Sequence, residues 1–218
     1  MAELCPQCSP MPPAHSPPYR AKFYVLAFFG SAWIAVIAIG FGLLLKHESS
    51  AGSSGAPCQD WPAKTGLVRA SDRPTLVVFA HPQCPCTRAA LSELAAILAR
   101  CSKPVQVDVV FYAPPGSPPG WARTHSWEAA KNIPGVRVRL DPDAAEAEIF
   151  GIETSGHALL FGLDGKLRFS GGVTIARGHE GQSPVQEPLL ALLSGESTEF
   201  HRSPVFGCAL VTPTEQQP

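Results

Sequence analysis

An uncharged apolar run dominates the N-terminal part of the chain. Residues 23–45 read FYVLAFFGSAWIAVIAIGFGLLL, without a charged side chain. A helix rises about 1.5 Å per residue, so the run is long enough to cross a hydrocarbon core of about 30 Å. The helices that soluble domains pack against their cores are usually shorter and carry a polar side. The sequence therefore predicts one transmembrane helix.

The flanks of this run bear on its processing and orientation. The run exceeds the apolar region of about 7–15 residues that is typical of a cleavable signal peptide. Residues 49–51, Ser-Ser-Ala, resemble a weak cleavage site, so both readings stay open and the length favours an uncleaved anchor. Arg20 and Lys22 precede the run, whereas Lys46 after it is offset by Glu48. Positive charge marks the cytoplasmic side, which predicts a single-pass protein with its N-terminus inside and its domain outside the cytoplasmic membrane. In a bacterium, that side is the periplasm.

The 218 residues provide for one ordinary domain besides the span. We expect an N-terminal cytoplasmic tail at 1–22, the transmembrane helix at 23–45, a flexible tether at 46–60, the domain at 61–196 and a C-terminal tail at 197–218. The formal net charge is -1. Nucleic-acid-binding domains carry a strong basic excess, so the composition speaks against a nucleic-acid partner.

Apolar periodicity predicts the elements of the domain. We expect strands at 75–80, 105–112, 136–140, 157–163 and 166–170, and helices at 87–101, 119–132, 142–150 and 183–195. Asp141 and Pro142 are typical of an N-cap followed by the first helical residue, and Gly151 of a helix end. Alternation followed by a hairpin at Asp164-Gly165 favours an α/β fold, with a mixed sheet and helices on both faces.

Two of the seven cysteines, Cys84 and Cys86, lie where the first strand gives way to a helix. A helix N-terminus favours the thiolate and lowers the pKa of a cysteine, which makes the sulfur a nucleophile toward disulfides. Residues two apart do not face each other on a helix. The pair can therefore close only if Cys84 precedes the first turn, and Pro85 restricts the backbone geometries that allow it.

This layout resembles the thioredoxin superfamily over residues 67–193. The residues that carry the resemblance are Phe79-Ala-His-Pro-Gln-Cys-Pro-Cys-Thr-Arg88, Phe150-Gly-Ile152, Leu159-Leu-Phe161 and Asp164-Gly-Lys166. The family places its nucleophilic cysteine five residues after a strand phenylalanine, as Cys84 stands after Phe79. The resemblance implies a thioredoxin-like fold and thiol–disulfide exchange with protein thiols, disulfides and a redox partner, through Cys84 and Cys86, without a required cofactor.

A closer resemblance is to RedB-type membrane-anchored bacterial proteins. It rests on His81-Pro-Gln-Cys-Pro-Cys86, Thr154-Ser-Gly-His157, Ser170-Gly-Gly-Val-Thr174 and Arg177-Gly-His-Glu180. It adds auxiliary candidates near the active site: His81, Pro85, Gly156, His157, Arg177, His179 and Glu180. Two features depart from the thioredoxin pattern. One residue fewer separates the cysteines, and the position of the family's cis-proline falls on Gly156.

Two other functions compete with exchange. His81, Cys84, Cys86 and His157 offer two imidazoles and two thiolates, a set that suits Cu(I) or Zn and predicts a periplasmic metal-transfer protein. A non-catalytic thioredoxin-like binding module is the third alternative, with aromatic side chains such as Trp121 and Trp127 on its surface. Surface or core positions are the ordinary explanation for single histidines and tryptophans.

The remaining cysteines allow several pairings. Cys101 lies on the apolar stripe of its helix, where a buried inert thiol is expected. Cys58 follows the tether and Cys208 lies in the tail, and an oxidising compartment would allow a disulfide between them. The sequence does not choose among the pairings of these three. Cys5 and Cys8 resemble half of a zinc site that lacks its other ligands.

Overall fold

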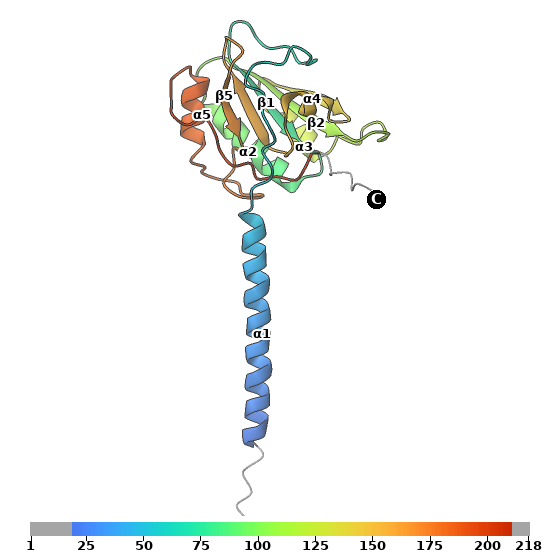
Figure 1. The fold of residues 1–218 in the computed structure, drawn as a ribbon, viewed down its shortest axis with the longest axis vertical. Coiled ribbons are helices and arrows are strands. Elements are labelled where there is room, and N and C mark those ends of the chain that lie inside the picture. The colour runs from blue at the N-terminus through green and yellow to red at the C-terminus, as the bar shows by residue number, and fades with distance from the viewer. Residues whose placement is uncertain (1–18, 211–218) are drawn as a thin grey trace, which may run out of the picture. The chain divides into compact units, whose positions relative to one another are not determined.

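A computed structural model of the chain describes residues 19–210, with side chains from residue 22 onward. Cys5, Cys8 and the tail beyond Leu210 lie outside the described residues. The chain divides into two compact units, with the boundary between Lys46 and His47. The first unit consists of most of helix α1 (Tyr19–Glu48), and the second is the domain that holds the cysteine pair (Figure 1).

Helix α1 contains the apolar run. Within residues 19–210, Lys22–Glu48 is the one helical stretch long and apolar enough to cross a membrane. Its large side chains, from Phe23 to Leu45, are exposed. A helix of this kind near the N-terminus is a candidate membrane anchor or signal sequence.

The domain is built on a five-stranded mixed sheet with strand order β3-β2-β1-β4-β5. The strands are β1 (Thr75–Ala80), β2 (Gln106–Ala113), β3 (Val136–Pro142), β4 (His157–Phe161) and β5 (Leu167–Gly171). β1, β2 and β3 are parallel, whereas β4 pairs antiparallel with both β1 and β5. The predicted thioredoxin-like mixed sheet is confirmed, including the hairpin between β4 and β5.

Helices cover both faces of the sheet, as predicted. They are α2 (Pro85–Arg100), α3 (His125–Lys131), α4 (Ala145–Phe150) and α5 (Gln186–Leu193). Apolar residues of α2, α3 and α5 share one core cluster, and those of α4 belong to the other. Because β1, β2 and β3 are laid down in one direction across the sheet, their two crossover helices fall on the same face.

Each of the four helices predicted in the domain begins at a different residue in the structure, and the last of them, α5, begins at Gln186 rather than residue 183. α2 begins earlier, at Pro85 rather than residue 87, and α3 begins later, at His125. β3 runs on to Pro142, which pairs with Ala113, so Asp141 is a strand residue instead of an N-cap. The Asp141 carboxylate still accepts N–H bonds from the first turn of α4, from Glu146 at 2.8 Å and Ala147 at 3.0 Å. The capping chemistry is present, but a turn separates the cap from the helix.

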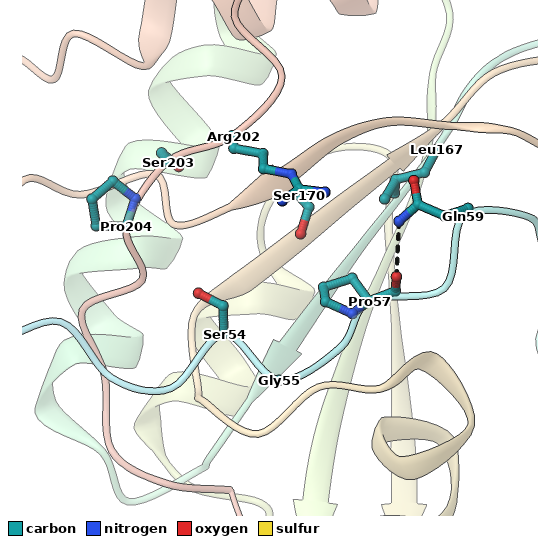
Figure 2. Close-up of a pocket in the computed structure, with 9 residues that line it drawn as sticks. All are labelled: Ser54, Gly55, Pro57, Gln59, Leu167, Ser170, Arg202, Ser203 and Pro204. Atoms are coloured by element: carbon teal, nitrogen blue, oxygen red, sulfur yellow. Dashed lines mark hydrogen bonds between the residues drawn. The ribbon is translucent and has the colours of Figure 1, made fainter.

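The segments before and after the sheet lie against the domain. Gly52 N–H donates to the Val205 carbonyl at 2.8 Å, which joins the expected tether to the expected tail. Val205 and Leu210 of the tail segment are buried. Figure 2 shows the two segments on either side of β5, around a cavity of about 390 Å³ that is lined by Ser54, Gly55, Pro57, Gln59, Leu167, Ser170, Arg202, Ser203 and Pro204.

Candidate active site

Cys84 occupies the N-cap of α2. Its backbone is extended, with φ -80° and ψ 124°, and Pro85 is the first helical residue. Cys84 N–H donates to the His81 carbonyl at 3.1 Å, and Thr87 N–H donates to the Cys84 carbonyl at 3.1 Å. Cys84 therefore precedes the first turn, which is the condition that a disulfide between Cys84 and Cys86 requires.

A third cysteine lies at this position. The Cys208 sulfur is 2.9 Å from the Cys84 sulfur, and both are free thiols. Cys84 and Cys86 are buried, with 3% and 5% of their surface exposed, whereas Cys208 is partly exposed. The pairing of Cys208 with Cys58, which the sequence left open, is not the arrangement found. Cys58 packs instead against the core cluster that contains the α4 residues.

The three thiols differ in proton affinity. Burial alone would raise the pKa of Cys84, but hydrogen bonds from the Cys208 thiol and from backbone N–H groups, including that of Thr87, outweigh it and lower the pKa. Burial and the nearby Cys84 charge raise the pKa of Cys86. Burial, together with its hydrogen bond to Cys84, raises the pKa of Cys208 to about 12. Negative charge at the site is therefore held by Cys84.

Ser155 connects the segments around Cys84. Its hydroxyl oxygen accepts the His81 N–H at 2.8 Å and lies 2.8 Å from the Thr87 hydroxyl. Its own N–H donates to the Cys208 carbonyl at 2.9 Å. Ser155 is fully buried. One residue thus holds the turn before α2, the start of α2 and the C-terminal segment.

Gly156 lies between Ser155 and β4, at the position where the thioredoxin pattern has its proline. Its φ is +86°, in the region that favours glycine, and its N–H donates to the Phe79 carbonyl at 2.7 Å. A Cβ at this position would lie 3.6 Å from the Cβ of Ala90 on α2. The glycine therefore lies next to α2, at the end of β1 that leads to the cysteines.

The loop after β5 returns to the cysteines. Arg177 donates to the Gly207 carbonyl at 2.6 Å. Its positive charge offsets part of the rise in the pKa values of Cys86 and Cys208. A hydrogen bond from the Gly178 backbone likewise offsets part of the rise in the pKa of Cys86. Arg177 therefore belongs to the site.

The other two candidates of this loop lie farther out. His179 and Glu180 are exposed, and Glu180 forms a 3.8 Å ion pair with Arg88 of α2. The buried Glu93 carboxylate, also on α2, accepts the Gly181 N–H at 2.6 Å. The loop is thus fastened to α2 at two successive residues, and His179 makes no contact in the structure that connects it with the cysteines.

His81 lies beside the site with its ring against Tyr112 and Trp121, with ring centroids 5.7 Å away in each case. Its Nδ1 accepts the Gln83 N–H at 3.2 Å. Partial burial lowers the pKa of His81. The ring therefore packs as part of an aromatic cluster, and its Nδ1 is occupied. Trp121 contributes to this cluster, whereas Trp127 packs against Phe111 in the core.

His157 is separated from the cysteines by the sheet. It pairs with Phe79 in register and shares a sheet face with Leu159, both in the core cluster on the α4 side. Its Nε2 lies 2.8 Å from the Ser170 hydroxyl, and burial lowers its pKa to about 4. Among residues 19–210 no group of three or more His, Cys, Asp or Glu side chains is arranged to hold a metal ion. The structure does not assemble the predicted four-ligand set.

Sequence reasoning missed three contributors to the site: Thr87, Ser155 and Cys208. Ser155 stands next to the predicted Gly156, so its position in the chain was an available signal. Cys208 was visible as an unassigned thiol, but nothing in the local sequence connects it with Cys84 across 124 positions. Cys101 lies at the other end of α2, where its thiol donates to the Lys103 carbonyl.

The comparison with solved structures finds proteins of similar fold. No family model matches the chain, and the comparison with curated proteins gives no match. A hypothetical protein of Sinorhizobium meliloti is similar, with 18% identity and a TM-score of 0.54 over 74% of this chain and 93% of that one. An uncharacterized conserved protein of Geobacillus kaustophilus is similar at the same identity and TM-score, over 76% and 94%. A putative thioredoxin of Neisseria meningitidis has 18% identity and a TM-score of 0.42 over 66% and 90%.

Proposed function

We propose that this chain is a membrane-anchored thiol–disulfide oxidoreductase of the RedB-like thioredoxin type. It acts in the periplasm, with Cys84 as the exchanging sulfur and Cys86 as the other member of the Cys-Pro-Cys pair. The observation that carries the proposal is the position of Cys84 at the N-cap of α2, with its pKa lowered by donated hydrogen bonds. A stabilised thiolate at a helix start is both the attacking and the leaving group that exchange requires.

The reaction balances with the two cysteines of the site, a substrate disulfide and a dithiol partner. The Cys84 thiolate attacks a substrate disulfide and forms a mixed disulfide, and one substrate sulfur leaves as a thiolate. Cys86 then attacks the Cys84 sulfur, which closes the Cys84–Cys86 disulfide and releases the second substrate thiol. A dithiol partner returns two electrons to the pair. The same steps in reverse oxidise a substrate dithiol, and neither direction needs a metal or another cofactor.

The test uses the full chain in lipid vesicles. We expect Cys84→Ser to reduce the rate of dithiothreitol-driven insulin disulfide reduction to the uncatalysed rate. Cys101→Ser, which removes a thiol at the far end of the same helix, is the matched control and keeps the full rate. An unchanged rate in Cys84→Ser would refute the proposal.

A further inference from the structure

We propose that Cys208 is a third redox cysteine, which forms a disulfide with Cys84 and carries exchange between the buried pair and external thiols. The inference rests on the exchange at Cys84 proposed above. It assigns the C-terminal segment a chemical function in place of the structural pin that a Cys58–Cys208 bridge would provide.

The first argument is distance. A disulfide bond is about 2.05 Å long, so the two sulfurs, now 2.9 Å apart, need to approach by only about 0.9 Å. Cys84 and Cys86 are two positions apart, which makes a small ring when they are joined. The contact with Cys208 closes a loop of 124 positions and carries no such constraint.

The second argument is that the contact is held from several sides. Ser155 N–H binds the Cys208 carbonyl at 2.9 Å, and Arg177 binds the adjacent Gly207 carbonyl at 2.6 Å. Leu210 N–H donates to the Glu153 carbonyl at 2.8 Å, on the other side of Cys208. A Cβ at Gly207 would lie 1.9 Å from the Ser155 carbonyl oxygen, so only glycine allows this close approach. The segment is therefore fixed with its thiol at the Cys84 sulfur.

The third argument is access. Cys84 exposes 3% of its surface and Cys86 exposes 5%, whereas Cys208 is partly exposed. An external sulfur therefore meets Cys208 first. When it attacks the Cys208 sulfur of a Cys84–Cys208 disulfide, Cys84 leaves as the thiolate, and a thiol of lowered pKa is the better leaving group.

The relay conserves electrons at each step. The Cys208 thiol gives up its proton as its sulfur attacks the Cys84 sulfur of the Cys84–Cys86 disulfide. The Cys84–Cys208 bond forms, and Cys86 leaves as a thiolate that takes up a proton. An external thiolate then attacks the Cys208 sulfur and releases Cys84. A second external thiol resolves that mixed disulfide, so two electrons enter and all three cysteines end as thiols.

The test uses the full chain in detergent micelles, with the four other cysteines changed to serine and a glutathione redox series. Trypsin cleaves after Arg88 and Arg202, which puts Cys84 and Cys208 in different peptides, and mass spectrometry detects their linkage. In Cys86→Ser we expect most molecules to form the Cys84–Cys208 disulfide. Gly207→Ala in the same background, which displaces Cys208, should lower that fraction several-fold. Cys86→Ala, which also removes the Cys86 thiol, should give the same Cys84–Cys208 disulfide as Cys86→Ser.

The outcomes separate this inference from the proposed function. If Cys86→Ser and Cys86→Ala keep both thiols free at a poise where Cys208→Ser forms Cys84–Cys86, the relay is refuted and the pair stands. If Cys84 forms no disulfide in any variant, the proposed function fails as well. Linkage of Cys208 to Cys84 that is insensitive to Gly207→Ala would also contradict the inference, because it would not depend on the held geometry.

Discussion

At the scale of single residues, the Cys208 thiol affects the pKa of Cys84. When Cys84 is a thiolate, the Cys208 thiol is the hydrogen-bond donor between the two sulfurs, and this bond helps to lower the pKa of Cys84. Cys208→Ala removes this donor, and we expect the pKa of Cys84 to rise. Thiolate absorbance near 240 nm, followed against pH, measures the change, and Cys58→Ala is the control because its thiol lies on the other face of the sheet. A titration that does not move in Cys208→Ala would show that the contact contributes nothing.

His157 is a second residue whose protonation affects the fold. Burial lowers its pKa from 6.5 to about 4, so between these values the unfolded chain binds a proton that the folded chain does not. The protonation of His157 therefore does not affect the free energy of unfolding above pH 6.5. As the pH drops from 6.5 toward 4, it lowers the free energy of unfolding by up to about 3 kcal/mol. Urea unfolding at pH 7 and pH 4.5 should show a smaller loss in His157→Gln than in the parent chain. The exposed His179, changed to Gln, should leave the loss unchanged.

At the scale of elements, Glu93 links α2 to the loop that carries Arg177. Its buried carboxylate accepts the Gly181 N–H and the Gln186 side-chain amide. Glu93→Ala leaves these donors without their acceptor and should lower the free energy of unfolding by about 1–3 kcal/mol. It should also speed hydrogen exchange at Gly181. Glu187→Ala, which removes only an exposed ion pair with Arg100, should change stability by less than about 0.5 kcal/mol.

The C-terminal segment is a structural element of the domain. Val205 is fully buried, so Val205→Ala should lower the free energy of unfolding by about 2 kcal/mol. Val68 is 72% exposed, and Val68→Ala should have almost no effect. Denaturant unfolding of the full chain compares the two. Equal effects would mean that the segment does not pack as the structure describes.

The sequence predicted this segment only as a tail, and the reason is physical. Residues 201–210 form no regular element with a period that a pattern can reveal. The conformation of these residues is fixed by hydrogen bonds to β5 and to the segment before β4. For example, the Ser170 N–H donates to the His201 carbonyl at 3.0 Å. The strands, by contrast, have apolar runs that predict burial directly, and the alternation of β1, α2 and β2 predicts the sheet. The same local chemistry placed Cys84 correctly at the start of α2.

The histidines show where prediction from sequence fails in the site. His81 stands three residues before Cys84, and His157 follows Gly156, the position expected to lie opposite the active site, which favoured a shared metal site. Successive strand residues point to opposite faces, so His157 lies on the face of the sheet that carries the α4 core cluster and not on the α2 face. Sequence proximity to an active-site turn does not fix the side of the sheet, and only the register of β4 against β1 decides it.

At the scale of the whole molecule, the account requires the domain to lie outside the cytoplasm. A membrane-impermeant maleimide applied to intact spheroplasts should label Cys101, in the domain. It should label Cys5 and Cys8, which precede the span, only after permeabilisation. Resistance of the chain to carbonate extraction would show that the span is retained as an anchor. Labelling of Cys5 before Cys101 would reverse the predicted orientation.

The central claim is reversible disulfide formation at Cys84, and its redox midpoint tests that claim most directly. The full chain in micelles, purified without chelator, would be equilibrated across a glutathione series and thiol-labelled, with metal analysis of the same sample. The account predicts a clean two-electron midpoint at which Cys84 loses its label, in protein without stoichiometric metal. A Cys84 that stays labelled throughout, in protein with one equivalent of copper or zinc, would contradict it.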